Sequence, residues 1–325
     1  MSPLTKKQGI TPISFDETSV KPVEKEALKS VYLDEGIHFF GNRCVIRIAN
    51  RLELREKAYK YVHEIYKSKG YVSSGSNNIR LSIYDALPDT TTLVAEDRTG
   101  KISGTLTVVF DSPIGLPGDD VYKEEIDKIR LTGNKVSEII SLGIDEYRID
   151  SLKILAGLFY CAFLFARDIK KSTDFVINVT PKHAEFYCKK IVFRKIGSEK
   201  KCPRVNGTTG VLLNLPLFLP AKLKKKIRIF PLYLFNHSDQ EEMEIARRLK
   251  SMISPMSDEE FYTFFVDKTD SWANASSAQK KYLKNIFVTH DIDHFGISRF
   301  LATGIPKKLQ NYESNQNYEI KMKKN

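Results

Sequence analysis

The sequence predicts an α/β protein whose central sheet is mixed, with parallel and antiparallel strands. Between residues 44 and 215, apolar segments of strand length are interleaved with segments of helical period. Two of the strand-like segments are joined by the short turn "RTGK", which predicts an antiparallel hairpin. After residue 218 the strand pattern stops and helical segments follow. We therefore predict a mixed sheet flanked by helices, followed by a mainly helical C-terminal extension.

Each predicted element has a local signal. The segment 44–49 alternates and is rich in β-branched residues, as strands are, and 50–70 carries one apolar helical stripe that ends at Gly70. The elements that follow are a hairpin (90–97, 102–111), a Pro- and Gly-rich loop (112–120), a short helix (121–133), a strand (135–145), a long apolar helix (151–170), a strand (174–179), a helix (181–191) and strands at 193–197 and 210–215. Three further helices, each opened by a Ser or Asp cap, are predicted at 239–253, 257–268 and 277–290.

The predicted organisation has three parts. Residues 1–38 show little periodicity and are expected to form an arm, and residues 39–217 form the α/β domain. Residues 218–325 form the extension, which ends in a disordered tail. The apolar content of 42% is sufficient for a sizeable core.

Several classes of protein are disfavoured. No apolar run reaches the roughly 18–20 residues of a membrane span, and the N-terminus has no secretory h-region, so we expect a cytoplasmic protein. The four cysteines lack the paired spacing of zinc sites or disulfide frameworks. The metal-capable segment "THDIDH" (289–294) has no second ligand cluster, so no metal site is predicted.

The net charge of +11 is concentrated in two stretches, 182–204 and 222–228, whose combined net charge equals that of the whole chain. Such a field attracts acidic partners, although a solvated lysine-rich surface is the simpler alternative. No nucleic-acid-binding motif accompanies the charge, so nucleic acid is not the expected partner. Residues 222–235 combine lysines with apolar residues and are a candidate for peripheral membrane contact.

The order of these elements is also the order of the GNAT acyltransferase fold. The segments "EIISLGID", "TPKHAEFYCKKIVFRKIG" and "KKCPRVNGTTGVLL", in this order after "LVAEDRTGKISGTLTVVFDSPIGLPGDD", resemble the long-chain N-acyl amino acid synthase family over about residues 40–217. That family is a GNAT branch related to acyl-homoserine-lactone autoinducer synthases. The resemblance implies transfer of a fatty acyl group from acyl carrier protein to the amine of an amino acid. It implies no permanently bound cofactor, and acyl-phosphopantetheine or acyl-CoA as the donor.

Glu138 is the leading candidate for the proton acceptor. Strand alternation places Glu138 on one face with Val136, Ile140 and Leu142, and burial there raises the pKa of a carboxyl group. A position where Glu138 meets solvent or pairs with a lysine is the alternative. Similar enzymes carry a glutamate here, usually in E-[IL]-S-R-[LF], but this chain has Ser141 in place of the arginine.

In similar enzymes this arginine could hold the acidic loop or bind a substrate carboxylate. In this chain another residue must take over that role. Arg130, Lys135 and Arg148 are the candidates to replace it. The departure also supports a rival function, a degenerate GNAT domain that binds acyl carrier protein or lipid without turnover. An autoinducer-type synthase that uses another amine is the rival enzyme.

The donor site is predicted where the long helix begins. A helix N-terminus binds phosphate, but the segment "RIDSLK" lacks the glycines of the GNAT pyrophosphate loop, which favours a single phosphopantetheine phosphate. An ordinary capped core helix is the alternative. Backbone amides beside residues 141–144 are expected to bind the oxyanion. The candidate donor-binding residues are Ser141, Leu142, Ile144, Arg148, Ser151, Asn178 and Thr180.

The stretch 179–197 is predicted to form a wall of the site. The resemblance implies that the strand ending at Val179 diverges from its neighbour and that the pantetheine arm lies in the gap. Tyr187 is the candidate proton donor to the leaving thiolate, or else a core residue beside Phe186. The candidate docking surface for acidic carrier protein consists of Lys182, Lys189, Lys190, Arg194 and Lys195. The loop 112–120 has no P-loop lysine, and in similar synthases it borders the acyl channel.

Overall fold

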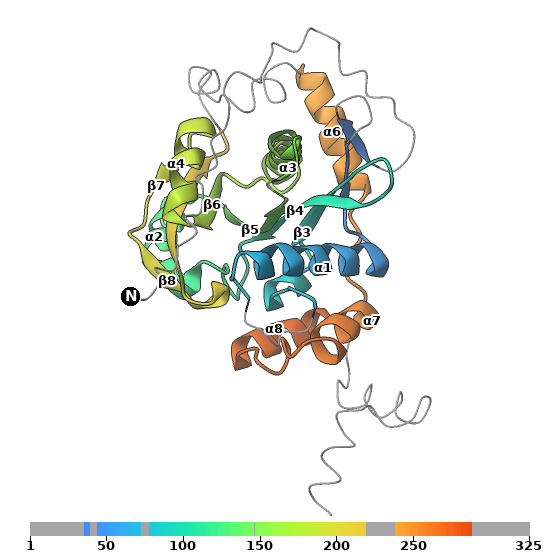
Figure 1. Cartoon of the computed structure of the whole chain (residues 1–325). Helices are drawn as coiled ribbons and strands as arrows, with labels where there is room; N and C mark the ends of the chain where they lie inside the picture. Colours follow the sequence, from blue (N-terminus) through green and yellow to red (C-terminus); the bar gives the residue numbers. More distant parts are fainter. Residues whose placement is uncertain (1–35, 40–43, 73–77, 146, 219–237, 288–325) are drawn as a thin grey trace, which may run out of the picture.

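The computed structural model describes residues 36–39, 44–72, 78–145, 147–218 and 238–287. Within them, one mixed sheet has the order β1-β2-β3-β4-β5-β6-β9-β7, and β8 pairs with β9 (Figure 1). The strands are β1 (Ile37–Phe39), β2 (Cys44–Ile48), β3 (Thr91–Glu96), β4 (Ile102–Phe110), β5 (Val136–Ile144), β6 (Asp174–Val179), β7 (Arg194–Lys195), β8 (Lys200–Cys202) and β9 (Thr208–Pro216). The helices are α1 (Leu52–Ser68), α2 (Asp119–Arg130), α3 (Ser151–Leu164), α4 (Pro181–Lys190), α6 (Asp239–Ser251), α7 (Asp258–Phe261) and α8 (Ser277–Ile286). The predicted mixed sheet flanked by helices, with a mainly helical C-terminal region, is confirmed.

The parallel pair β5–β6 determines where the sheet opens. Helix α3 connects these two strands, as a crossover must for parallel neighbours. Their pairing runs only from Val136 opposite Asp174 to Ile139 opposite Ile177. Beyond it, β5 continues to Ile144 and β6 to Val179, and β6 pairs with β9 along its whole length. The two strands therefore diverge at their C-terminal ends, as the resemblance implied.

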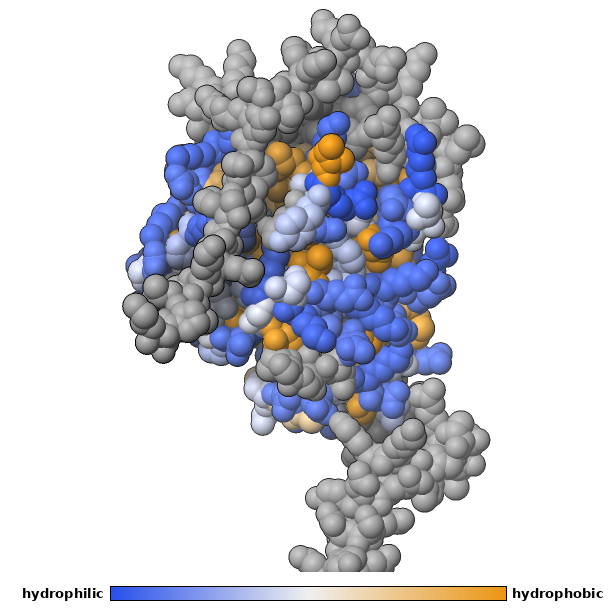
Figure 2. Space-filling view, in the orientation of Figure 1, coloured by the Kyte–Doolittle hydropathy of each residue, from blue (hydrophilic) through white to orange (hydrophobic). Residues whose placement is uncertain are grey.

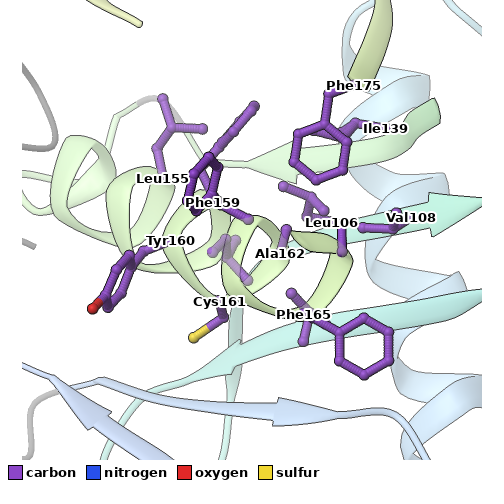
Figure 3. Packing of buried hydrophobic residues seen from close by; sticks show 14 of the residues in the cluster. Leu106, Val108, Ile139, Leu155, Phe159, Tyr160, Cys161, Ala162, Phe165 and Phe175 are labelled. Carbon is purple, nitrogen blue, oxygen red and sulfur yellow. The ribbon is translucent and has the colours of Figure 1, made fainter. Parts of the chain in front are cut away.

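Helix α3 fills the core on one face of the sheet. Its sequence is apolar on all sides, and every residue from Ile154 to Leu164 is buried. Figure 3 shows Leu155 and Phe159 of α3 beside Ile139, Leu106 and Phe175 of the sheet. Alternation along the strands builds a second core on the opposite face, around Tyr59, Leu116 and Tyr122.

The C-terminal extension packs on both faces of the sheet. Helix α6 lies against α3, and Arg167 donates a hydrogen bond of 2.7 Å to Glu242. The turn after α7 inserts Phe264 and Phe265 into the second core. Three capped helices begin within one residue of the predicted starts, and capping boxes form at Ser257, as predicted, and at Ser238 and Ser276, each one residue before the predicted cap.

A buried ion pair anchors the extension to α1. Arg55 contacts Glu260 at 2.5 Å, with side chains 8% and 10% exposed, and Arg55 also donates to the Ser254 carbonyl. Removing one member of such a pair leaves a buried charge without a partner, which is strongly destabilising.

Some boundaries differ from those predicted. Strand β1 begins at Ile37, within the last residues of the predicted arm. Strand β8 was not predicted, because Lys200 and Lys201 give it almost no apolar signal, and the strand predicted at 193–197 shortens to β7. The helix predicted at 151–170 ends at Leu164 and continues as a π-helical turn, Phe165–Ile169.

The remaining sequence signals are partly outside the described residues. The basic segment 222–228, the candidate membrane segment 222–235, the "THDIDH" motif and the predicted tail all lie there. In the described ranges, none of the helices combines the length and apolar character needed to cross a membrane. Figure 2 shows a mainly hydrophilic surface over α1, with separate hydrophobic patches above it.

Candidate active site

A cavity of about 570 Å³ lies where β5 and β6 diverge. Its walls come from β5, β6, the first turn of α3, helix α4, the end of α1 and the β8–β9 hairpin. The sequence-predicted residues that line it are Glu138, Ser141, Leu142, Ile144, Ser151, Asn178, Thr180, Lys182, Tyr187, Lys189 and Lys190. Arg148, Arg194 and Lys195 are not among the lining residues.

Glu138 is buried in the cavity wall, with only 1% of its surface exposed. Its Oε2 accepts a hydrogen bond of 2.5 Å from the Gly118 backbone N–H, and its Oε1 lies 3.9 Å from Arg204 Nη2. Burial raises the pKa of Glu138 to about 7, against the lowering effects of Arg204 and the Gly118 amide. The carboxyl group therefore exchanges a proton near neutral pH.

The loop that carries Gly118 is fixed by Arg130. Its guanidinium binds Asp111 at 2.6 and 2.9 Å and Asp119 at 2.8 Å, and Asp119 accepts from the Leu116 N–H at 2.7 Å. A Cβ on Gly118 would lie 3.0 Å from Glu138 Oε2, so a glycine suits this close approach. Of the three candidates to replace the missing arginine, Arg130 is therefore the one that holds the acidic loop, which carries Asp111, Gly118 and Asp119.

The other two candidates lie elsewhere. Arg148 pairs with Asp150 at 3.0 Å, and Lys135 is exposed. Neither forms an ion pair with Glu138, whose pairing cation in the described chain is Arg204.

A β-bulge at Ser141 breaks the alternation of β5. Ile140 is opposite Thr107 and Gly143 is opposite Thr105, so two residues of β5 oppose one of β4. Ser141 has a φ of 50°, in the left-handed region, and its carbonyl accepts from the Thr105 hydroxyl at 3.0 Å.

The bulge corrects the face predicted for Leu142. Leu142 packs with the core of Ile139, whereas Val136 and Ile140 belong to the opposite core. The prediction that Leu142 shares the Glu138 face was therefore wrong, because the extra residue reverses the alternation. The Leu142 N–H belongs to the same trans peptide as the Ser141 carbonyl, so it points away from Thr105.

Asn178 presents a polar group to the cavity from β6. Its Oδ1 is buried and has no hydrogen-bond partner among the described residues. A Cβ on Gly210 would lie 2.1 Å from this oxygen, so glycine at 210 leaves room for the carboxamide. A buried acceptor without a donor is costly, and a ligand N–H would satisfy it.

Ser151 and Thr180 stand at the starts of the two helices that border the cavity. Thr180 caps α4, with its hydroxyl 3.0 Å from His183 Nδ1. Pro181 occupies the first turn, as predicted. Ser151 begins α3, whose cap residue Asp150 makes no side-chain cap bond.

Tyr187 belongs both to the core and to the cavity wall. Its ring packs against Phe159 and Phe193, each at a centroid distance of 5.8 Å, and against Phe186 at 5.4 Å. The residue is 6% exposed, and burial raises the pKa of its phenol above the usual value of 10. Tyr187 therefore remains protonated, as a proton donor must be before it acts.

Helix α4 places its lysines at the edge of the cavity. Lys182 and Lys189 are exposed, and Lys189 pairs with Glu185. Arg194 and Lys195 lie on β7, exposed but outside the cavity lining.

Sequence reasoning missed the cations of the other wall. Arg80 and Arg204 line the cavity from segments far apart in the chain. Arg204 sits in a short turn between β8 and β9, and was counted only as part of a basic stretch. No local pattern in the sequence indicates that Arg204 lies beside Glu138.

Comparisons with known proteins give one family model and several similar solved structures. The family model for N-acyl amino acid synthase FeeM matches residues 57–216. The chain is similar to the structure of FeeM, an N-acyl amino acid synthase from uncultured soil microbes, with 25% identity over 54% of this chain and 90% of that chain and a TM-score of 0.48.

Two acyl-homoserine lactone synthases are also similar. For LasI the identity is 15%, over 58% of this chain and 94% of that chain, with a TM-score of 0.43. For the CoA-dependent synthase MesI the identity is 14%, over 59% and 97%, with a TM-score of 0.40. A comparison with curated proteins gives no match.

Proposed function

The chain belongs, through residues 57–216, to the FeeM family of N-acyl amino acid synthases, and we propose that it transfers a long-chain acyl group from acyl carrier protein to the amine of an amino acid. The family relationship predicted from the sequence is confirmed, and it makes the protein an acyltransferase. The proposal of acyl transfer to an amine rests mainly on Glu138. This residue is a buried carboxyl group with a near-neutral pKa, and it lies in the wall of a cavity between diverging strands.

The proposed first step is deprotonation of the acceptor. The amine attacks a thioester only when it is neutral, so its proton must leave. Glu138 accepts this proton, directly or through one water, and the raised pKa allows it to do so near pH 7. The Gly118 N–H holds the carboxylate in place during the transfer.

The amine nitrogen then bonds to the thioester carbon, whose oxygen becomes negatively charged. The Leu142 N–H, turned away from Thr105 by the bulge, is the proposed donor to this oxyanion. When the intermediate collapses, the carbon–sulfur bond breaks, the electron pair leaves with sulfur, and the nitrogen releases its second proton to water. Tyr187 is the proposed donor of the proton that neutralises the thiolate, and it regains a proton from water before the next turnover.

We propose that the acyl donor is carried by acyl carrier protein. The pantetheine arm is proposed to lie between β5 and β6, where the Asn178 carboxamide oxygen has no other partner in the described chain. Its phosphate would meet the start of α3 and Lys182 of α4, and the carrier would dock on Lys189, Lys190, Arg194 and Lys195.

Mass spectrometry of lipid extracts from cells that overproduce the chain tests the proposal. We expect N-acyl amino acids in these extracts and not in extracts of cells that produce the Glu138→Gln variant. The degenerate-domain alternative predicts that N-acyl amino acids are absent while binding to acyl carrier protein is retained.

A further inference from the structure

The cavity is lined by two groups of cations on different elements. Lys182, Lys189 and Lys190 come from α4. Lys69, Arg80 and Arg204 come from the end of α1, from the segment after it and from the β8–β9 turn. A single anionic group on the donor would contact only one of these two sets of cations, so the other set is open to an anion on the acceptor.

Arg204 has hydrogen-bonding capacity that the described residues do not use. Its guanidinium lies 3.5 Å from Asp120 and 3.9 Å from Glu138, both longer than a normal charged hydrogen bond. Its Nε is buried without a hydrogen-bond partner in the part of the chain that the structure describes. A guanidinium carries five N–H donors, so Arg204 is able to bind a planar anion.

Arg80 is held in position beside Arg204. One of its Nη atoms donates a 2.6 Å hydrogen bond to the Arg204 carbonyl. The guanidinium also lies 5.3 Å from the centroid of the Tyr66 ring. These contacts fix the orientation of the Arg80 guanidinium in the cavity wall, which lowers the entropy cost of binding an anion.

The position of Arg204 next to Glu138 indicates which anion belongs here. In an α-amino acid the carboxylate carbon is about 2.5 Å from the amine nitrogen, because only Cα separates them. An acceptor whose amine approaches Glu138 therefore brings its carboxylate near Arg204, which is 3.9 Å from the same Glu138.

We propose that Arg80 and Arg204 form the subsite that binds the α-carboxylate of the acceptor amino acid. This inference rests on the proposed function, since it assigns a residue set to the acceptor of that reaction. It makes the acceptor an α-amino acid with a free carboxylate. Amino-acid amides and simple amines are poor acceptors, because they offer no carboxylate to the two guanidinium groups.

Calorimetric binding of two product-like probes to the full chain tests the subsite without requiring turnover. The probes are N-dodecanoylglycine and its uncharged carboxamide, which differ only at the group under test. The unsubstituted protein is expected to bind the acid at least 10-fold more tightly than the amide. Arg80→Gln and Arg204→Gln are expected to reduce this preference at least fivefold, and Arg80→Lys to retain part of it.

Lys201→Gln is the matched control, because Lys201 is an exposed cation on β8 outside the cavity lining. Its preference for the acid should equal that of the unsubstituted protein. Equal binding of the two probes by the unsubstituted protein, or no binding of either, overturns the proposal. So does full retention of the preference in both glutamine variants, provided that their thermal unfolding shows them to be folded.

The experiments distinguish failure of the proposed function from failure of the carboxylate subsite. If the unsubstituted protein prefers the acid through these arginines but forms no N-acyl amino acid from a thioester, the carboxylate subsite stands and the synthase activity does not. If N-acyl amino acids form but the arginine variants keep the preference, the activity stands and the subsite assignment is wrong.

Discussion

Replacing Glu138 with glutamine should change how the stability of the protein depends on pH. Glutamine has nearly the shape of a protonated glutamate, and its carbonyl oxygen can accept the Gly118 N–H that Glu138 Oε2 accepts now. The variant removes one titration from the folded protein and leaves the other groups in place, including Asp85, whose pKa burial raises to about 6.

The pKa of Glu138 determines the direction and the size of the change in unfolding free energy with pH. Burial raises it from 4.5 to about 7, so the folded state holds a proton that the unfolded chain releases. The stability from this proton is fully present below pH 4.5 and is lost as the pH rises through 7. A shift of this size corresponds to about 3 kcal/mol. The free energy of unfolding of Glu138→Gln, relative to the unsubstituted protein, should therefore rise by about that amount between pH 4 and pH 8.

Urea unfolding at four pH values over this range measures the difference. Glu185→Gln is a suitable control, because Glu185 is exposed and its pKa is lowered by the hydrogen bond from Lys189. That variant should show no such rise. A difference between Glu138→Gln and the unsubstituted protein that stays flat from pH 4 to pH 8 would refute the assignment of a near-neutral carboxyl group at position 138.

Three further predictions address the donor, the docking surface and the extension. Acyl carrier protein should be preferred to acyl-CoA at matched chain length, and equal kcat/KM values for the two donors would contradict this. Reversing Lys189, Lys190 and Arg194 to glutamate should raise KM for the carrier on the order of 10-fold at low salt and less at high salt, with little effect on a small soluble thioester. Equal losses with both donors would show that these cations act on the bound substrate in the cavity and not in docking the carrier. Arg55→Met should destabilise the protein by about 3–5 kcal/mol, because Glu260 is left buried without its partner. A decrease below about 1 kcal/mol in the free energy of unfolding, measured with urea, would show that the pair does not anchor the extension.

The sheet and most of its helices were predictable because their signals are local. The strand 174–179 and the helix that follows Pro181 occur where the sequence places them, since alternation, a proline and a cap are all visible in one short segment. Glu138 was identified in the same way, from a charged residue on an apolar strand, and the structure places it in the cavity wall.

The rest of the site depends on contacts between distant segments. The bulge at Ser141 moves Leu142 to the other face of the strand. The sequence does not indicate this bulge, because a serine rarely adopts the positive φ that Ser141 has here. Arg204 meets Glu138 through a turn 66 positions further along the chain, and the position of that turn depends on the β8–β9 pairing. Such contacts are products of the tertiary fold, and no periodicity in the sequence records them.

The central claim is that Glu138 accepts the proton of an amine during acyl transfer. Single-turnover assays with purified protein, acyl carrier protein loaded with a long-chain acyl group, and an amino acid test this claim most directly when the product is measured by mass spectrometry. The unsubstituted protein should form the N-acyl amino acid at a rate that increases with pH through about 7, the pKa of Glu138. Glu138→Gln should bind the carrier normally and react roughly 100-fold more slowly. A variant rate close to that of the unsubstituted protein would contradict the account.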